Sequence, residues 1–279
     1  MGSAFADFLS SLGARLGLGD VIVFVIGLAF GSFGGMLASR VPRKLAPTGR
    51  SGCPHCGAAL SPSELIPVVS FLIQRGCCKH CGERISGGYL LVELSTAVTF
   101  VLFYRYFGLG IVGIINLILA LHFTVLAGTD MMHGLLPNRV ILSGLAYALL
   151  LRIVEPLQGA GGIVAGGLSA GSGSASAGIG GSGFGGGLLA SIWPSLRDGL
   201  IGAALGFGFF FLIALLKPGS MGGGDIKMAA LIGLYLGVWR LFPALGLGFI
   251  LSSLYSIPML IAGKLKRTDT LPLGIFLSL

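Results

Sequence analysis

The chain has 279 residues, of which 54% are apolar and only 10% are charged, and its mean hydropathy is +0.94. Soluble globular domains carry about 25% charged residues, so this composition excludes a water-soluble enzyme. The large apolar fraction also excludes a disordered protein. The 49 glycines show no Gly-X-Y period and come with only 12 prolines, which excludes collagen. A polytopic membrane protein remains.

Apolar segments recur along the chain at lengths that suit membrane helices, which need about 20 residues to cross a bilayer. Residues 3–18 have apolar side chains at helical spacing and predict an interfacial helix. Residues 21–39 form the first anchor, because this stretch is too long for a signal peptide and its basic residues follow it. Six further spans are expected, at 90–104, 106–129, 135–154, 199–216, 228–239 and 241–263. Residues 271–279 are apolar but too few to cross.

The basic residues indicate how these helices are oriented. With Met1 outside the cell, 13 of the 18 Lys and Arg residues fall on the cytosolic side, as the positive-inside rule requires. The net charge of +8 then reflects topology and contact with anionic lipid. We therefore expect the lipid bilayer as a partner, and no nucleic acid.

Four of the five cysteines lie in one hydrophilic insert, as Cys53-x-x-Cys56 and Cys78-x-x-Cys81. Two such turns supply the four thiolates of a tetrahedral structural zinc site. A pair of disulfides is the alternative, which a reducing cytosol disfavours. Cys77 does not fit the two-residue spacing and is expected to be a free or packing thiol. His55 and His80, inside the two turns, are expected to be solvated.

Three acidic residues near the predicted membrane border carry the chemistry that we expect: Glu93, Asp130 and Asp225. Charged groups are costly within a bilayer, so their presence suggests function. Asp130 and Asp225 both fall at the cytosolic ends of their helices, where an ionised and a protonated carboxyl can act as base and acid in peptide hydrolysis. Alternatively, Asp130 is an interfacial residue and Asp225 caps the next helix. Glu93 is either a packing carboxylate or a functional one.

These segments predict an all-α polytopic membrane protein with seven to eight transmembrane helices and a small cytosolic zinc-knuckle domain. The expected order is an extracytoplasmic interfacial segment (1–20), a first transmembrane helix (21–41), a zinc-binding domain with four cysteine ligands, here called the cysteine insert (42–89), and transmembrane helices with the first aspartate (90–154). A Gly/Ser-rich extracytoplasmic loop (155–197) follows, with a flexible linker at 159–187. Transmembrane helices with the Gly-Gly-Gly-Asp motif (198–279) complete the chain.

The motifs and their order resemble the type 4 prepilin leader peptidases, which are membrane aspartic proteases with a Gly-x-Gly-Asp motif. The resemblance covers nearly the whole chain. It is carried by Gly31-Ser32-Phe33, the two cysteine turns, Ile66-Pro67-Val68 with Ser70-Phe71, Leu91-Val92-Glu93-Leu94, Asp130 with Leu136-Pro137, Gly222-Gly223-Gly224-Asp225-Ile226-Lys227 and Leu271-Pro272-Leu273-Gly274.

This resemblance implies a specific activity. Asp130 and Asp225 would be the catalytic pair that cuts the basic leader from type 4 prepilins and pilin-like secretion subunits, at the cytosolic face of the bacterial inner membrane. Members with the cysteine-bearing domain often also methylate the new amino terminus with S-adenosylmethionine, and the methyltransferase residues stay unassigned here. Three readings compete with it: a presenilin-like intramembrane protease, a transporter or proton channel with a carboxylate pair, and a zinc-braced scaffold without activity.

Overall fold

The computed structural model describes residues 17–43, 45–46, 49–53, 55–160, 186–217 and 222–261. Within these ranges the fold is helical, and the backbone forms only two isolated β-bridges. Seven long helices follow one another: α2 (Leu18–Arg40), α4 (Gly88–Phe107), α5 (Ile111–His133), α6 (Asn138–Ala160), α7 (Gly186–Leu216), α8 (Gly223–Leu236) and α9 (Val238–Ile261). A 3-10 turn (Pro62–Leu65) and the short helix α3 (Val69–Ile73) lie in the cysteine insert. The predicted all-α fold class is confirmed.

Five of these helices are long and apolar enough to cross a membrane within the described ranges, namely α2, α4, α5, and parts of α6 and α7. Helix α8 has 14 residues and is therefore about 21 Å long, which is short of the hydrocarbon thickness of about 30 Å. The chain is thus a multi-pass membrane protein. The interfacial helix expected before residue 17, most of the linker at 159–187 and the apolar end at 271–279 lie outside the described residues.

The helices do not end at the charged residues that bound the predicted spans. Arg105 lies inside α4, and Arg240 lies inside α9. Glycines end the helices instead: Gly108 follows α4 with φ 70° and Gly237 follows α8 with φ 78°, a left-handed backbone that side chains disfavour. Helices α6 and α7 also run further into the Gly/Ser-rich segment than expected, to Ala160 and from Gly186.

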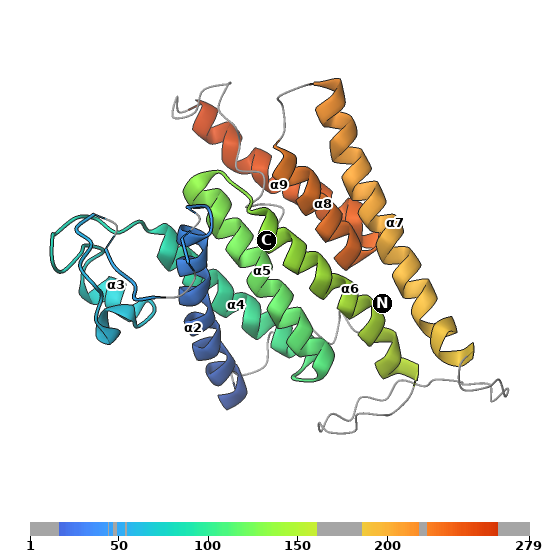
Figure 1. Ribbon diagram of the computed structural model, residues 1–279, viewed down its shortest axis with the longest axis horizontal. Coiled ribbons are helices and arrows are strands. Elements are labelled where there is room, and N and C mark those ends of the chain that lie inside the picture. Colours follow the sequence, from blue (N-terminus) through green and yellow to red (C-terminus); the bar gives the residue numbers. More distant parts are fainter. Residues whose placement is uncertain are drawn as a thin grey trace.

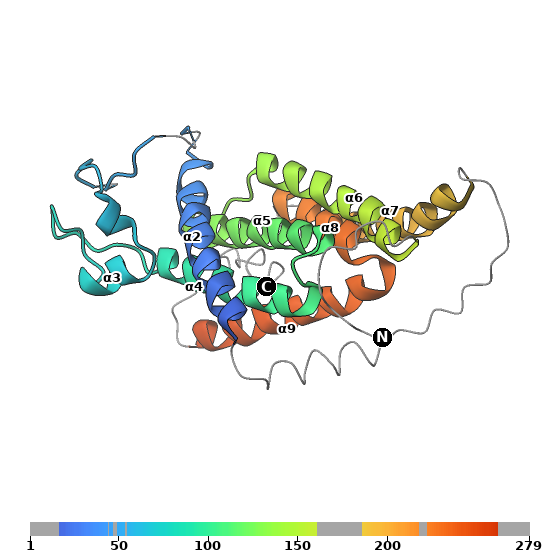
Figure 2. The same ribbon diagram turned by 90° about the horizontal axis from the view of Figure 1, so that it is seen from below.

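The helices form two groups joined by α6. Helices α2, α4 and α5 pack together, as do α7, α8 and α9, and α6 contacts α5, α7 and α8 (Figures 1 and 2). Small residues allow α2 and α4 to approach closely. A Cβ at Gly27 would lie 2.6 Å from the Cα of Ala97, and one at Gly31 would lie 2.7 Å from the Cα of Glu93.

Polar side chains are buried inside the bundle while large apolar ones face outward, as expected where lipid is the solvent. Thr96, Asn116 and Thr129 are almost fully buried. The exposed apolar side chains include several on α2 and α7, such as Val21, Ile22, Val25, Phe207, Phe209, Phe211 and Leu212.

Two polar clusters that no local sequence pattern predicts lie at the end of the bundle away from the cysteine insert. Arg105 at the end of α4 pairs with Asp20 at the start of α2, with Nη2 and Oδ2 2.8 Å apart. Arg152 donates to the carbonyl oxygens of Leu234 and Tyr235 at 2.9 and 3.0 Å. These contacts tie helix ends together across both groups.

Candidate active site and metal centre

The two Cys-x-x-Cys segments adopt the same backbone turn. The Gly57 amide donates to the Cys53 carbonyl at 2.9 Å, and the Gly82 amide donates to the Cys78 carbonyl at 2.8 Å. Both glycines have a left-handed φ, 71° for Gly57 and 73° for Gly82, which glycine adopts at no steric cost. The insert therefore folds as two matched knuckles that face one another.

The four predicted ligands come together, with their Sγ atoms all within 4.8 Å of one another. The Cys53 and Cys81 sulfurs are 3.9 Å apart, close to the spacing of about 3.8 Å that tetrahedral zinc imposes when each Zn–S bond is about 2.3 Å. All five cysteines are free thiols, so the disulfide alternative is wrong for this structure. The donor set fits a metal ion.

The electrostatics of the cluster also favour a cation. Amides of Cys56 and His55 lower the pKa of the Cys53 thiol to about 6. The Glu83 amide favours the Cys81 thiolate, but burial and hydrogen bonds with the other three sulfurs outweigh it and raise the pKa of Cys81 to about 12. Four thiolates cannot ionise side by side without a positive charge among them, which a divalent metal supplies.

The fifth cysteine and the two histidines of the insert agree with the sequence-based expectations. Cys77 is outside the sulfur cluster, with its Sγ 3.7 Å from the Arg75 carbonyl oxygen. His55 and His80 are exposed. The structure thus separates the four clustered thiols from the fifth.

Glu93 attaches the cysteine insert to the bundle. It lies in α4, and its Oε2 accepts a 2.8 Å hydrogen bond from the amide of Val68 in the insert. Val68 has φ 61°, which is unusual and strained for a β-branched residue. The carboxylate therefore holds a strained turn against the first helices of the bundle, a role that the sequence left open.

Asp130 and Asp225 lie at the ends of α5 and α8, and both of these helices pack against α6. Asp130 is buried in the last turn of α5, and Asp225 is half-buried in the first turn of α8. The helices are joined by a 2.7 Å hydrogen bond from Tyr235 Oη to Asn116 Oδ1. At a rise of 1.5 Å per residue, Asp130 lies about 21 Å from Asn116 along α5, toward the C-terminal end of that helix. Asp225 lies about 15 Å from Tyr235 along α8, toward the N-terminal end of that helix. A second contact fixes the direction of the two helices, because Gly224, next to Asp225, lies against Leu136, which follows α5. Both aspartates therefore lie at the same end of α5 and α8.

Asp225 is not the helix cap that the sequence offered as an alternative. Gly222 occupies the cap position, and Asp225, three residues later, accepts a 3.3 Å hydrogen bond from the Gly222 amide. Two further contacts join the N-terminal end of α8 to the segment that follows Asp130. A Cβ at Gly224 would lie 2.7 Å from the Cβ of Leu136, and Lys227 Nζ donates to Asn138 Oδ1 at 2.8 Å.

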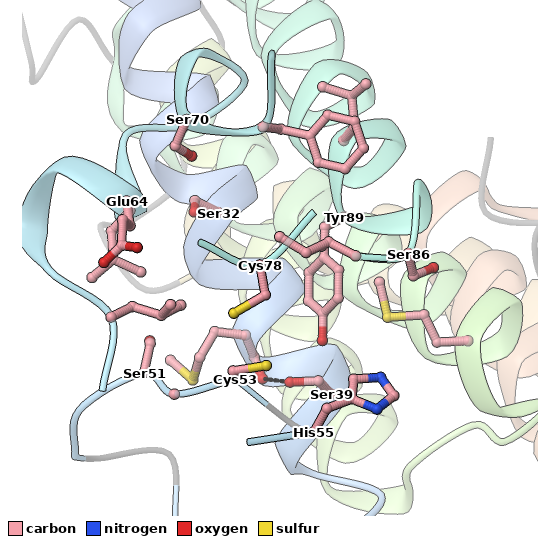
Figure 3. A pocket seen from close by; sticks show the side chains of 18 of the residues that line it. Ser32, Ser39, Ser51, Cys53, His55, Glu64, Ser70, Cys78, Ser86 and Tyr89 are labelled. Carbon is pink, nitrogen blue, oxygen red and sulfur yellow. Dashed lines mark hydrogen bonds between the residues drawn. The ribbon is translucent and has the colours of Figure 1, made fainter. Parts of the chain in front are cut away.

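A cavity of about 720 Å³ lies between the cysteine insert and the same end of the bundle. Figure 3 shows Cys53 and Cys78 of the knuckles, Ser32 and Ser39 of α2, and Tyr89 of α4 around it. Met131, Met132 and His133, the residues directly after Asp130, also line it. Sequence reasoning missed this cavity, because its walls come from segments far apart in the chain.

Comparisons with known proteins match most of the chain to one family of peptidases. Residues 25–107 match the bacterial peptidase A24 N-terminal domain, and residues 182–257 match the type IV leader peptidase family. A prepilin leader peptidase/N-methyltransferase of Bacillus subtilis is 34% identical over 254 residues, covering 90% of this chain and 87% of that protein.

More distant relatives carry the same name. That of Myxococcus xanthus is 31% identical, covering 79% of this chain and 56% of its own length, and that of Burkholderia pseudomallei (strain 1026b) is 28% identical, covering 82% and 64%. No solved structure matches the chain significantly. This chain belongs to the prepilin leader peptidase/N-methyltransferase family.

Proposed function

We propose that this protein is a membrane aspartic endopeptidase that removes the basic leader from type 4 prepilins and pilin-like secretion subunits, and that it then methylates the new amino terminus. The observation that carries the proposal is that α5 and α8 run in opposite directions beside α6 and that each has an aspartate at the same end. The names of the relatives give the class of substrate.

Asp130 and Asp225 act as the catalytic pair. Two carboxylates about 4 Å apart repel by about 4 kcal/mol at an effective dielectric of about 20, so they retain one proton between them. The ionised aspartate removes a proton from water, and the protonated one donates to the carbonyl oxygen of the scissile peptide. Gly223, two residues before Asp225, has open space where a Cβ would lie, so a substrate backbone can come close there, since glycine has no Cβ.

The pair faces the cytosol. The cysteine insert, at the same end of the bundle, carries a group of basic residues, and the positive-inside rule assigns such segments to the cytosolic side. The short basic leader of a prepilin also remains on that side. The inner membrane is therefore the location that we propose, with the cleavage site near the lipid border.

The sulfur cluster binds one structural zinc ion through Cys53, Cys56, Cys78 and Cys81. Four thiolates close the coordination sphere, so the metal braces the insert and leaves no position for water. Methylation requires a methyl donor, S-adenosylmethionine, which the name of the relatives supports. The metal thus has a structural role, and the two aspartates perform the hydrolysis.

Incubation with a peptide that has a basic leader, a glycine and an apolar helix tests both activities. Mass spectrometry should show loss of the leader, and with S-adenosylmethionine a further gain of one methylene mass. An intact peptide would contradict the peptidase. Ion-dependent flux from proteoliposomes without cleavage would favour a transporter instead.

A further inference from the structure

The last turn of α8 ends against an ion pair that comes from two other helices. Arg152 of α6 is buried, with an exposed fraction of 8%, and its Nη1 lies 3.7 Å from Oδ2 of Asp198 in α7. Both side chains reach Gly237, the single residue between α8 and α9 (Figure 1). The proteolysis proposed above does not use this pair, which lies at the opposite end of α8 from Asp225.

Arg152 caps the C-terminal end of α8. A helix leaves its last four carbonyl groups without helical partners, and unpartnered groups are costly where lipid excludes water. Arg152 donates from Nε to the Leu234 carbonyl oxygen at 2.9 Å and from Nη2 to the Tyr235 carbonyl oxygen at 3.0 Å. Its positive charge also favours the negative end of the helix dipole. One side chain of α6 thus holds the last turn of α8 in place.

Asp198 holds the start of α9 in a similar way. Its Oδ1 accepts a 3.3 Å hydrogen bond from the amide of Val238, the first residue of α9. Gly237 leaves room for both charged groups, because a Cβ there would collide with Asp198 Oδ2 and lie 2.9 Å from Arg152 Nη2. Arg152 and Asp198 together therefore grip the turn between α8 and α9, and we call this pair the turn clamp.

The packing of α8 against α7 gives the turn clamp a role beyond capping. A Cβ at Gly202 of α7 would collide with the Gly233 carbonyl oxygen of α8, and one at Gly206 would collide with that of Ala229. Such contacts of backbone on backbone set the distance between two helices, but they supply no side chain that interlocks along the helix axis. Buried polar or ionic groups can fix the register of packed helices instead.

We propose that Arg152 is a positioning residue for Asp225, which acts through α8 from the far end of the bundle. Leu234 is nine residues after Asp225 in the chain, or about 14 Å along the helix, and a rigid helix carries a shift of one end to the other. The guanidinium keeps α8 in the register that holds Asp225 at the same end as Asp130. The effect on cleavage rests on the proposed function, whereas the register of α8 does not depend on it.

A contact at the other end of α8 reports this register without any need for activity. Lys227 Nζ donates to Asn138 Oδ1 at 2.8 Å. Asn138→Asp keeps the shape of the side chain and supplies a carboxylate, which a water-soluble carbodiimide joins to Lys227 as an amide while the reagent takes up the water as a urea. Peptide mapping by mass spectrometry measures the yield of this crosslink. A shift of α8 along its axis separates the two groups and lowers the yield.

The experiment compares two buried arginines at the same end of the bundle, in the Asn138→Asp background. Arg152→Met removes the cap of α8. Arg105→Met is the matched control, because the Arg105 side chain is 11% exposed against 10% for Arg152, and Arg105 pairs with Asp20 of α2 rather than with a residue beside α8. Both changes should lower the thermal midpoint in detergent. Only Arg152→Met should lower the crosslink yield, and by severalfold.

Cleavage of the leader-bearing peptide by the same arginine variants, without the Asn138 change, gives the second measurement. At equal amounts of folded enzyme, kcat of Arg152→Met should fall about tenfold or more while KM stays within about twofold, since a small misplacement of a catalytic group slows the chemical step. Arg105→Met should keep the wild-type kcat. Arg152→Lys retains a charged donor that can reach a carbonyl oxygen, so it should restore part of both kcat and the crosslink.

Equal crosslink yields in Arg152→Met and Arg105→Met would overturn the proposal. A loss of kcat that the two variants share would also overturn it, because reduced stability alone would then explain the loss. If Arg152→Met does not fold, Arg152→Lys and Arg105→Lys are compared in the same two assays, and equal results again contradict the positioning role. A wild type that does not cleave the peptide removes the proposed function, while the crosslink yields still decide whether Arg152 sets the register of α8.

Discussion

Tyr235 Oη and Asn116 Oδ1 are 2.7 Å apart, and this hydrogen bond joins the two helices that carry Asp225 and Asp130. Asn116 is 1% exposed, so water cannot replace a lost partner. Tyr235→Phe should lower stability by about 1 kcal/mol, the usual scale for such bonds within membranes, and should reduce cleavage. The thermal midpoint in detergent measures the first effect. Tyr106→Phe, on an exposed tyrosine, is the control, and an equal shift in both variants would refute this role.

Lys227 Nζ donates a 2.8 Å hydrogen bond to Asn138 Oδ1. The contact fixes the first turn of α8 against the start of α6, so Lys227→Met should misplace Asp225. We expect kcat for leader removal to fall severalfold while the protein still accumulates in the membrane. Lys217→Met removes an exposed charge after α7 and should retain full activity. Equal activity in both variants would show that the contact has no positioning role.

The hydrogen bond from the Val68 amide to Glu93 should hold the cysteine insert against the bundle. Glu93→Met removes the acceptor for the Val68 amide, and the insert should loosen. Trypsin should then cut faster after the exposed Arg75 and Lys79. Glu93→Gln retains an acceptor oxygen and should restore most of the protection. If both variants are cut at the wild-type rate, the contact does not restrain the insert.

Metal content separates the four clustered cysteines from the fifth. Purified protein should contain about one zinc per chain. Cys53→Ser should lose the metal, whereas Cys77→Ser should retain it, because Cys77 lies outside the sulfur cluster. Since thiolates bind the metal, retention should weaken as the pH falls and protons compete for sulfur. Zinc in both variants at wild-type level would contradict the assignment.

The sequence predicted the helices and the sulfur cluster well, because both depend on local patterns. Apolar length is sufficient to find a membrane helix, and two Cys-x-x-Cys turns define their own geometry. The helix ends are predicted less accurately, because Arg105 and Arg240 lie inside helices while the turns occur at Gly108 and Gly237. A charge near a helix end can turn toward the interface, so it does not mark where the helix stops.

Contacts between distant segments were not predictable from one sequence. Asp20 pairs with Arg105, 85 residues away, and no local pattern relates them. The same holds for the cavity, which is lined both by Glu64 of the insert and by His133 of α5. The roles of Asp130 and Asp225 stay predictions. What the fold adds is that they lie at the same end of α5 and α8, two helices that both pack against α6.

Cleavage by single aspartate variants tests the central claim most directly. Asp130→Asn and Asp225→Asn keep the size of each side chain but remove its ability to ionise, and Glu155→Gln provides the matched change on α6. Each protein is incubated with the leader-bearing peptide, and the products are weighed by mass spectrometry at equal amounts of folded enzyme. We expect both aspartate variants to lose cleavage by at least about a hundredfold while Glu155→Gln cuts normally. Full cleavage by either aspartate variant would contradict the account.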